Sequence, residues 1–362
     1  MIDFRYHLVS IVAVFLALAI GIVLGSTELQ GAAGAVLRTA NSSLTSQLNA
    51  TRAERDAAAA QAGAANAFLQ TSESVLLGSG HLLAGDKLVL VTEPGASLPV
   101  TNGVKAAAAD AGATVTGEVA LQPTFNDLSG ATEATLSSIN GSQAANDGTT
   151  LAAGADPQTA YQQDAAQLIA TAILQKQESQ AALQNQRSQQ NQQGQAGLSA
   201  ASAQTLLSAY AQAGFLTVSG SPTNRAGLVV IIAPDSVPAD GSSDPANQVL
   251  VAIGREFAAA GAVTVIAGAT TPSSQAGSAI SVVRGTPAVS SLVSTVDNAD
   301  TTQGQVTVMQ AIATQLAGGQ PGSYGISGAN SVSPTPAPTA PQTPAPSTQP
   351  TSTGKGKLVN KK

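Results

Sequence analysis

The chain has no cysteine and no tryptophan, and it has only two histidines and two methionines. The absence of cysteine excludes disulfide frameworks, thiolate metal sites and cysteine nucleophiles. Two histidines leave little material for histidine-based catalysis or for a zinc site. Charged residues make up 10% of the chain, against about 25% in ordinary soluble proteins, and the net charge is −6. A broad nucleic-acid-binding surface is therefore not expected.

The first feature that the chain does have is a long apolar run. Residues 8–27 (LVSIVAVFLALAIGIVLGST) contain no charged side chain, and a helix of about 20 residues spans about 30 Å, the thickness of a bilayer core. Arg5 precedes the run and Glu28 follows it, so the positive-inside rule places the rest of the chain outside the cytoplasm. We favour an uncleaved membrane anchor over residues 1–27.

A cleaved signal peptide is the alternative interpretation of this run. The apolar region of a signal peptide usually has about 7–15 residues and ends at an A-x-A-like cleavage site. The apolar core here extends from Leu8 to Leu24, and no clean cleavage site follows it. Both interpretations export the remainder of the chain.

Residues 28–78 are rich in Ala, Gln, Ser and Asn and contain a weak heptad pattern. Leu37 and Leu44 lie seven residues apart, and Leu48 and Leu69 fit the complementary position. A helix of about 50 residues would extend about 75 Å. We predict a coiled-coil stalk that joins copies of the chain; the alternative is one helix packed on its own domain.

Residues 79–330 alternate between short apolar runs and helical stretches, which predicts an α/β domain. The expected strands are 87–92, 113–121, 227–233, 262–267 and 280–284. The expected helices are 100–111, 157–177, 200–214, 244–260 and 304–316. Near-continuous Val and Ile runs are typical of a parallel sheet that is covered on both faces. We therefore predict a doubly wound, mostly parallel sheet.

Two segments have a composition that does not favour a packed structure. Residues 175–197 are rich in Gln and Asn, with too few apolar side chains to pack, and are predicted to be a flexible insertion. Residues 331–362 are rich in Pro, Thr and Ser and end in lysines, which predicts a disordered basic tail. The tail either contacts anionic envelope polymers or lipids or has no specific role.

The chain lacks the common catalytic and nucleotide-binding motifs. No strand end matches G-x-G-x-x-G or a Walker A loop, and no G-x-S-x-G elbow occurs. Glu93 and Asp235 follow two of the expected strands and could in principle act as a carboxylate pair, although such acids more often cap loops. We assign no catalytic residue and no cofactor, and we expect that the protein is not an enzyme.

Three residues are candidate metal ligands. Asp297 and Asp300 flank Asn298 in a D-x-x-D arrangement that could bind a hard cation through oxygen atoms. The more common role of such short polar side chains is turn formation and helix capping. His81, between the predicted stalk and the domain, is the third candidate.

Three segments of the chain resemble a known family. They are residues 1–26 (MIDFRYHLVSIVAVFLALAIGIVLGS), 291–312 (SLVSTVDNADTTQGQVTVMQAI) and 318–325 (GGQPGSYG). Their order and spacing resemble the actinobacterial copper transporter family, over about residues 1–328. The resemblance implies a single-pass envelope protein that takes part in copper efflux or homeostasis, with an oligomeric pore among the implied arrangements.

The residues themselves support the implied single-pass topology better than they support the implied binding of copper. Cu(I) prefers Cys, Met and His ligands, and beyond the initiator methionine the chain offers His7, His81 and Met309. The first hypothesis is a transport component that oligomerises through its anchor and stalk. The alternative is a non-transporting envelope scaffold whose inactive α/β domain binds an envelope protein. Gly21 and Gly25 form a G-x-x-x-G pair that favours helix packing over a wet pore.

Overall fold

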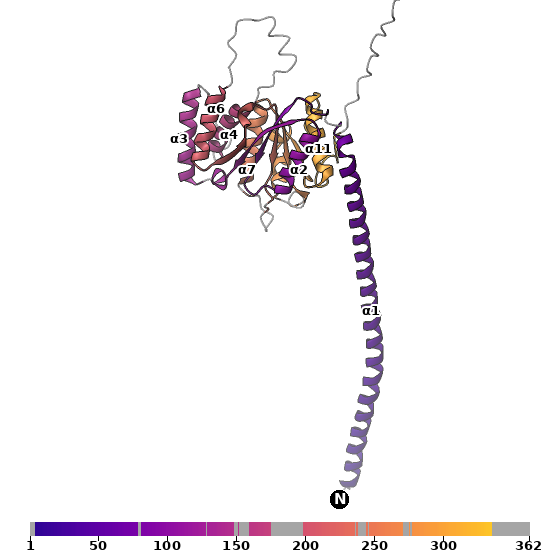
Figure 1. The fold of residues 1–362 in the computed structure, drawn as a ribbon. Coiled ribbons are helices and arrows are strands. Elements are labelled where there is room, and N and C mark those ends of the chain that lie inside the picture. Colours follow the sequence, from indigo (N-terminus) through magenta and orange to yellow (C-terminus); the bar gives the residue numbers. More distant parts are fainter. Residues whose placement is uncertain are drawn as a thin grey trace, which may run out of the picture. The chain divides into compact units, whose positions relative to one another are not determined.

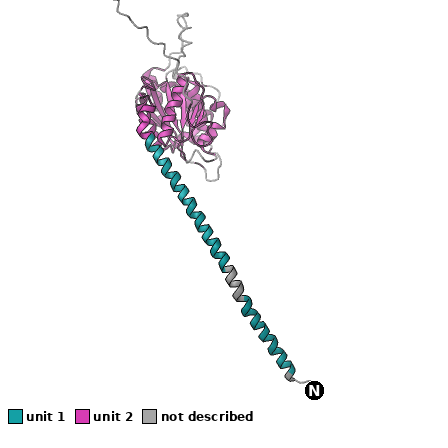
Figure 2. Ribbon diagram, turned by 90° about the vertical axis from the view of Figure 1, so that its right-hand side faces the viewer, with its two compact units in different colours: residues 1–68 teal, residues 69–362 magenta. Residues whose placement is uncertain are grey.

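The computed structural model describes most of the chain between residues 4 and 334. The described ranges are 4–78, 81–127, 129–147, 151, 159–174, 198–235, 237, 244, 246–270, 275 and 277–334. The predicted insertion at 175–197 and the part of the predicted tail from 335 to 362 lie outside these residues. The chain consists of two compact units, residues 1–68 and residues 69–362 (Figure 2).

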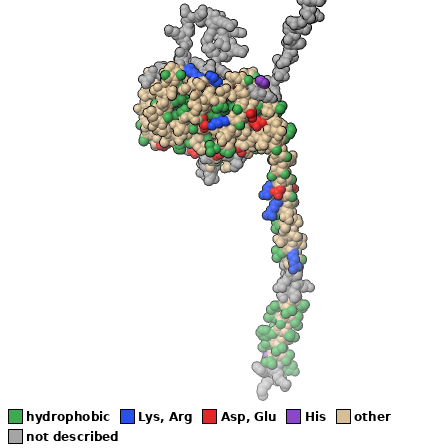
Figure 3. Space-filling model, in the orientation of Figure 1, with side chains coloured by type: hydrophobic (Ala, Val, Ile, Leu, Met, Phe, Trp, Pro, Cys, Tyr) green, Lys and Arg blue, Asp and Glu red, His purple; other side chains and the backbone are tan. Residues whose placement is uncertain are grey.

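The first unit is helical, and its helix is the greater part of α1 (Phe4–Leu76). Within it, Tyr6–Gly25 is long and apolar enough to cross a membrane, and none of this segment is buried. Hydrophobic side chains cover this part of the helix surface (Figure 3). The sequence that follows contains many alanines, the residue with the highest helix propensity. The prediction of an N-terminal apolar helix is therefore confirmed.

The second unit contains a seven-stranded sheet in the order β3-β2-β1-β4-β5-β6-β7. All neighbouring pairs are parallel except β2 and β3, so β3 is an antiparallel edge strand. This arrangement confirms the prediction of a mostly parallel sheet. The strands are β1 (Lys87–Thr92), β2 (Thr114–Leu121), β3 (Leu216–Gly220), β4 (Leu228–Ile232), β5 (Val263–Ala267), β6 (Ser294–Val296) and β7 (Ser323–Tyr324).

Helices cover both faces of this sheet (Figure 1). One face packs against α2 (Leu98–Asp110) and α11 (Thr302–Leu316). The helices of the opposite face are α3 (Gly130–Asp147), α4 (Ala160–Ile173), α6 (Ala200–Gln212), α7 (Ala246–Ala259), α9 (Ala279–Arg284) and α10 (Pro287–Ser290). Two short 3₁₀ helices, η1 (Pro123–Asn126) and η2 (Pro222–Asn224), follow β2 and β3.

The central strands explain why the sequence favours this architecture. In β1, Val89 and Val91 face the core under α4 and α7, whereas Leu88 and Leu90 face the core under α2 and α11. All residues of β4 (LVVII) are buried. Because successive side chains of a strand point to opposite faces, only a continuous apolar run can line both cores.

The expected strand at 280–284 is wrong, because this segment forms α9. Ser278 caps the helix: its side-chain oxygen accepts a hydrogen bond from the backbone nitrogen of Ser281 at 3.2 Å. Ile280 and Val283 then lie three residues apart on the buried side of a helix. The β-branched composition of Ile-Ser-Val-Val favours a strand locally, but the cap and the core contacts stabilise a helix.

Seven further elements of the described residues were not predicted from the sequence. They are the strands β3, β6 and β7, the helices α3 and α10, and the short 3₁₀ helices η1 and η2. The first residue of β3 is buried and its last four are exposed, so it has no continuous apolar run. The other predicted strands and helices of the domain are present, with ends that differ by a few residues.

Candidate functional site

The carboxyl ends of β1 and β4 meet at the point where the winding of the sheet changes direction. The helix that follows β1, α2, lies on one face of the sheet, and α7, which follows β4, lies on the other. In doubly wound sheets, ligands bind in the crevice at this switch point. The two loops are fixed to each other, since the Asp235 backbone nitrogen donates to the Gly95 carbonyl at 2.9 Å and Ala96 pairs with Pro234.

Glu93, the first residue after β1, is buried at this edge with only 3% of its surface exposed. The Nδ2 of Asn126 donates to its Oε2 at 3.1 Å. The other carboxylate oxygen, Oε1, is buried without a hydrogen-bond partner, and so is Oδ1 of Asn126. Burial raises the pKa of Glu93 to about 7, and the Asn126 hydrogen bond offsets part of this increase.

The local sequence explains how Asn126 reaches Glu93. Asn126 ends the turn η1, which has Pro123 at its start and the fully buried Phe125 as its anchor. Proline at the first position and an apolar anchor fix the turn, so the asparagine side chain is directed to the neighbouring strand end. The sequence analysis did not identify Asn126; the available signal was a Pro-x-Phe-Asn turn directly after a predicted strand.

Two more carboxylates belong to the same edge of the sheet. Burial raises the pKa of Asp235, a hydrogen bond from Ser97 lowers it, and the nearby Asp300 charge raises it. Asp300 is held in place by Thr270, whose backbone nitrogen and hydroxyl donate to its Oδ1 at 2.9 and 2.7 Å. β1 pairs with β4, so the prediction that Glu93 and Asp235 follow neighbouring strands is confirmed.

The candidate metal ligand Asp297 is fully buried and already has partners for both oxygens. It pairs with the Arg284 guanidinium at 2.8 Å. It also accepts from the backbone nitrogens of Ile326 at 2.7 Å and Ser327 at 3.0 Å. Asp300 accepts its hydrogen bonds from Thr270 instead. The two carboxylates of the D-x-x-D segment therefore share no hydrogen-bond partner among these contacts.

His81, the third metal candidate, is exposed in the turn before β1. Its backbone nitrogen donates to the Gly78 carbonyl at 3.1 Å. The described residues contain no group of three or more His, Cys, Asp or Glu side chains that could hold a metal ion. A metal role for His81, Asp297 or Asp300 remains a prediction.

Arg284 brings together the two C-terminal segments that carry the family resemblance. Its Nε donates to the Thr295 hydroxyl at 2.9 Å, and its Nη2 donates to the Tyr324 carbonyl at 2.7 Å. Gly325 has a φ of 127°, and a Cβ there would overlap the Asp297 carboxylate. These residues therefore build a packed structural node around a buried ion pair.

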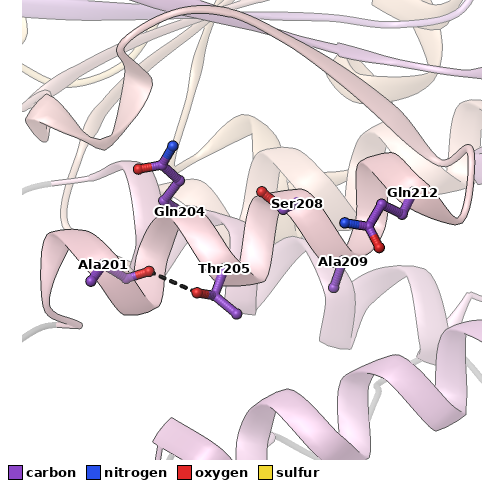
Figure 4. Close-up of a pocket in the computed structure, with 6 residues that line it drawn as sticks. All are labelled: Ala201, Gln204, Thr205, Ser208, Ala209 and Gln212. Atoms are coloured by element: carbon purple, nitrogen blue, oxygen red, sulfur yellow. Dashed lines mark hydrogen bonds between the residues drawn. The ribbon is translucent and has the colours of Figure 1, made fainter.

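A shallow depression of about 480 Å³ lies on the surface of α6 (Figure 4). Its lining consists of small and uncharged polar side chains of this one helix: Ala201, Gln204, Thr205, Ser208, Ala209 and Gln212. The Thr205 hydroxyl bonds back to the Ala201 carbonyl at 3.0 Å. The depression therefore offers no charged or nucleophilic group for chemistry.

In the first unit, apolar side chains of α1 are exposed along the helix. Leu37, Leu44 and Leu48 expose 70%, 62% and 51% of their surface. A Cβ added at Gly21 or Gly25 would meet nothing within 4 Å. The helix therefore presents its heptad leucines and its glycine pair to the surroundings.

The sequence model of the family described as "Copper transport outer membrane protein, MctB" matches residues 1–334 of this chain. The chain belongs to the MctB family. The proteins named "Copper transporter MctB" in Mycobacterium bovis and Mycobacterium tuberculosis are each 30% identical over 336 residues, covering 90% of this chain and 96% of theirs. The protein of the same name from Mycobacterium leprae is 29% identical over 342 residues, covering 92% of this chain and 99% of its own.

Family membership confirms the resemblance seen in the three sequence segments. The matched region includes the apolar span of α1 and the node around Arg284 and Asp297. The family and its relatives are named for copper transport and not for a catalysed reaction. This chain is thus a copper transport family protein with an N-terminal apolar helix.

Proposed function

We propose that this MctB-family protein takes part in copper efflux or homeostasis as a single-pass, membrane-anchored protein of the cell envelope. The family match over residues 1–334 carries the copper assignment. The apolar span Tyr6–Gly25, at the start of an uninterrupted helix, supports the anchor. Arg5 stands before this span, so the α/β domain lies outside the cytoplasm.

We further propose that copies of the chain associate through α1. Leu37, Leu44 and Leu48 follow the seven- and four-residue spacing of a coiled-coil seam and are all exposed. The glycine pair Gly21 and Gly25 allows close approach of a second helix within the membrane. Anchors that enter the same membrane with the same orientation make the helices parallel.

The second candidate function is a scaffold that does not conduct copper. The described residues that could provide soft nitrogen or sulfur ligands are His7, His81 and Met309, and Met309, a residue of α11, is fully buried in the core. Ser10 is the single polar side chain between Leu8 and Leu24, which favours helix packing over a wet pore. In this alternative the exported domain binds an envelope protein, and any effect on copper is indirect.

A copper transport assay on the purified full-length chain distinguishes the two candidate functions. The chain is reconstituted into lipid vesicles loaded with a copper-sensitive dye, beside vesicles without protein and vesicles with an unrelated single-pass protein. Copper entry that depends on the chain is the result expected for a transport component. A copper signal equal to both controls, for Cu(I) and Cu(II), contradicts transport by this chain alone and favours the scaffold.

The absence of cysteine makes association directly testable by cross-linking. A Leu44→Cys variant places one thiol in the predicted seam, and Ser46→Cys places one about 200° away on the same helix. Oxidation of membranes should give a covalent dimer from Leu44→Cys and much less from Ser46→Cys. Equal cross-linking at both positions would contradict a defined seam.

A further inference from the structure

We propose that Glu93 and Asn126 form the acceptor end of a binding site for a small ligand with a protonated primary amine. The site lies at the carboxyl edge of the sheet, beside the switch point between β1 and β4, where ligands of doubly wound folds bind. It is independent of the proposed role in copper transport.

The decisive observation is a pair of buried acceptor atoms with no donor. Oε1 of Glu93 and Oδ1 of Asn126 are both covered, and neither has a hydrogen-bond partner. Their side chains are joined through Asn126 Nδ2 and Glu93 Oε2, so the two free oxygens belong to one connected pair. Buried polar atoms in native proteins are nearly always satisfied, which indicates that a donor from outside the described residues belongs here.

Reassigning the amide of Asn126 does not remove this requirement. If the amide is turned by 180°, its oxygen faces the carboxylate, and a hydrogen bond forms only when Glu93 is protonated. In that arrangement Glu93 Oε1 and the amide nitrogen are left unpaired instead. Each arrangement of the described pair therefore leaves two buried polar atoms unsatisfied.

The surrounding charges favour a cationic ligand. Asp235 and Asp300 lie at the same edge of the sheet, and the charge of Asp300 is one of the causes that raise the pKa of Asp235. None of the ion pairs among the described residues brings a Lys or Arg side chain to Glu93, Asp235 or Asp300. A positively charged donor would complement this potential, whereas an anion would be repelled.

The number of available acceptors favours an ammonium group over a metal ion. Mg²⁺ and Ca²⁺ require about six to eight oxygen ligands. The described residues provide no group of three acidic or imidazole side chains for this purpose. A primary ammonium has three donors and needs few acceptors, of which Glu93 Oε1 and Asn126 Oδ1 are the two that the site offers. Asn126 is only half-buried, so one member of the pair is in contact with the solvent.

The burial of Glu93 also predicts how its substitution changes the stability of the folded chain. A buried carboxylate without a compensating cation destabilises the folded chain when it is ionised. Replacement of Glu93 by the isosteric glutamine removes this charge and should leave the protein at least as stable, while amine binding is weakened. A residue with a purely structural role would show the opposite, a loss of stability on substitution.

The test uses the purified full-length chain in detergent, above the pKa of Glu93, with n-butylammonium chloride and 1,5-diaminopentane as probes. Binding is followed by ligand-observed NMR and by the shift in melting temperature. n-Butanol serves as the neutral analogue, and magnesium, calcium and Cu(II) chlorides serve as metal comparators. Both amines should bind, and n-butanol should not.

Glu93→Gln should weaken amine binding at least about tenfold, the loss expected for one charge-assisted hydrogen bond. Glu118→Gln is the matched control, because this carboxylate is already paired with Lys105 at 2.7 Å; it should bind amines as the natural chain does. Asn126→Ala removes the second acceptor and should also weaken amine binding. If Glu93→Gln does not fold, this variant tests the proposal in its place. Equal amine affinity in both site variants and the natural chain would overturn the proposal, as would binding of the metals alone.

Discussion

At the scale of single residues, the most consequential contact is the buried ion pair between Arg284 and Asp297. The Asp297 side chain is fully buried, and the Arg284 side chain is 10% exposed. Asp297→Asn would leave the guanidinium buried without a counter-charge. We expect this substitution to lower the free energy of unfolding by about 3 kcal/mol, the range measured for broken buried pairs. Urea unfolding of the full-length chain measures the change.

The matched control is the exposed pair formed by Arg55 and Asp56. These side chains are 76% and 67% exposed, so the solvent screens their interaction. Asp56→Asn should leave the urea midpoint unchanged within error. Equal effects of the two substitutions would show that the Arg284 node does not stabilise the fold.

At the scale of secondary-structure elements, the cap at Ser278 stabilises the start of the helix formed by residues 279–284. Its side-chain oxygen satisfies the backbone nitrogen of Ser281 at the start of α9. We expect Ser278→Ala to lower the free energy of unfolding by about 1 kcal/mol, as is typical of a lost N-cap. Thermal unfolding followed by circular dichroism measures it, with Ser208→Ala on the exposed side of α6 as the control. Equal melting temperatures for both variants would contradict a capping role.

The packing of α4 against α7 predicts a pH dependence of stability. Burial, and to a lesser extent the Glu256 charge, raise the pKa of Asp164 to about 6. Between the unfolded value near 3.8 and this value, the folded chain binds more protons than the unfolded chain. The Asp164 contribution to stability is therefore fully present at low pH and is lost as the pH rises through about 6.

Asp164→Asn removes this titration. At neutral pH the variant should be more stable than the natural chain, and the difference should vanish below the unfolded pKa. Urea midpoints over a pH series measure both results. Glu133→Gln, in the first turn of α3, is the control for a general effect of removing one negative charge. A constant difference at every pH would show that Asp164 does not titrate in this range.

At the scale of the whole molecule, the apolar span of α1 should determine where the protein is found in the cell. Arginine at the centre of a membrane span costs about 3 kcal/mol per residue on insertion scales. The double substitution Leu16→Arg and Ile20→Arg should therefore prevent stable membrane insertion. Alkaline carbonate extraction of membranes should then release the variant, whereas the natural chain should stay in the pellet.

Leu37→Arg, outside the span but on the same helix, is the control for the anchor prediction. It adds a positive charge to an exposed position and should remain membrane-bound. Release of both variants would show that membrane association depends on α1 self-association and not on insertion of the apolar span. Retention of both would contradict Tyr6–Gly25 as the anchor.

Most elements of the α/β domain could be predicted because their signal is local. The apolar runs of β1, β4 and β5 are long enough to line two cores, and Asp244 lies at the start of α7 and accepts a hydrogen bond from the Ala246 nitrogen at 2.9 Å. The wrong strand at 280–284 and the missing β3 have the same cause. Their structure depends on packing partners that lie far away in the sequence.

The sequence by itself determined the apolar N-terminal helix, the mostly parallel doubly wound sheet and the family, since each follows from composition and order along the chain. The tertiary structure alone decided what the polar residues do. It paired Asp297 with Arg284, separated it from Asp300, and joined Glu93 to Asn126. The physical reason is that a buried carboxylate takes its role from the donors and charges that the fold places around it, and these come from distant segments.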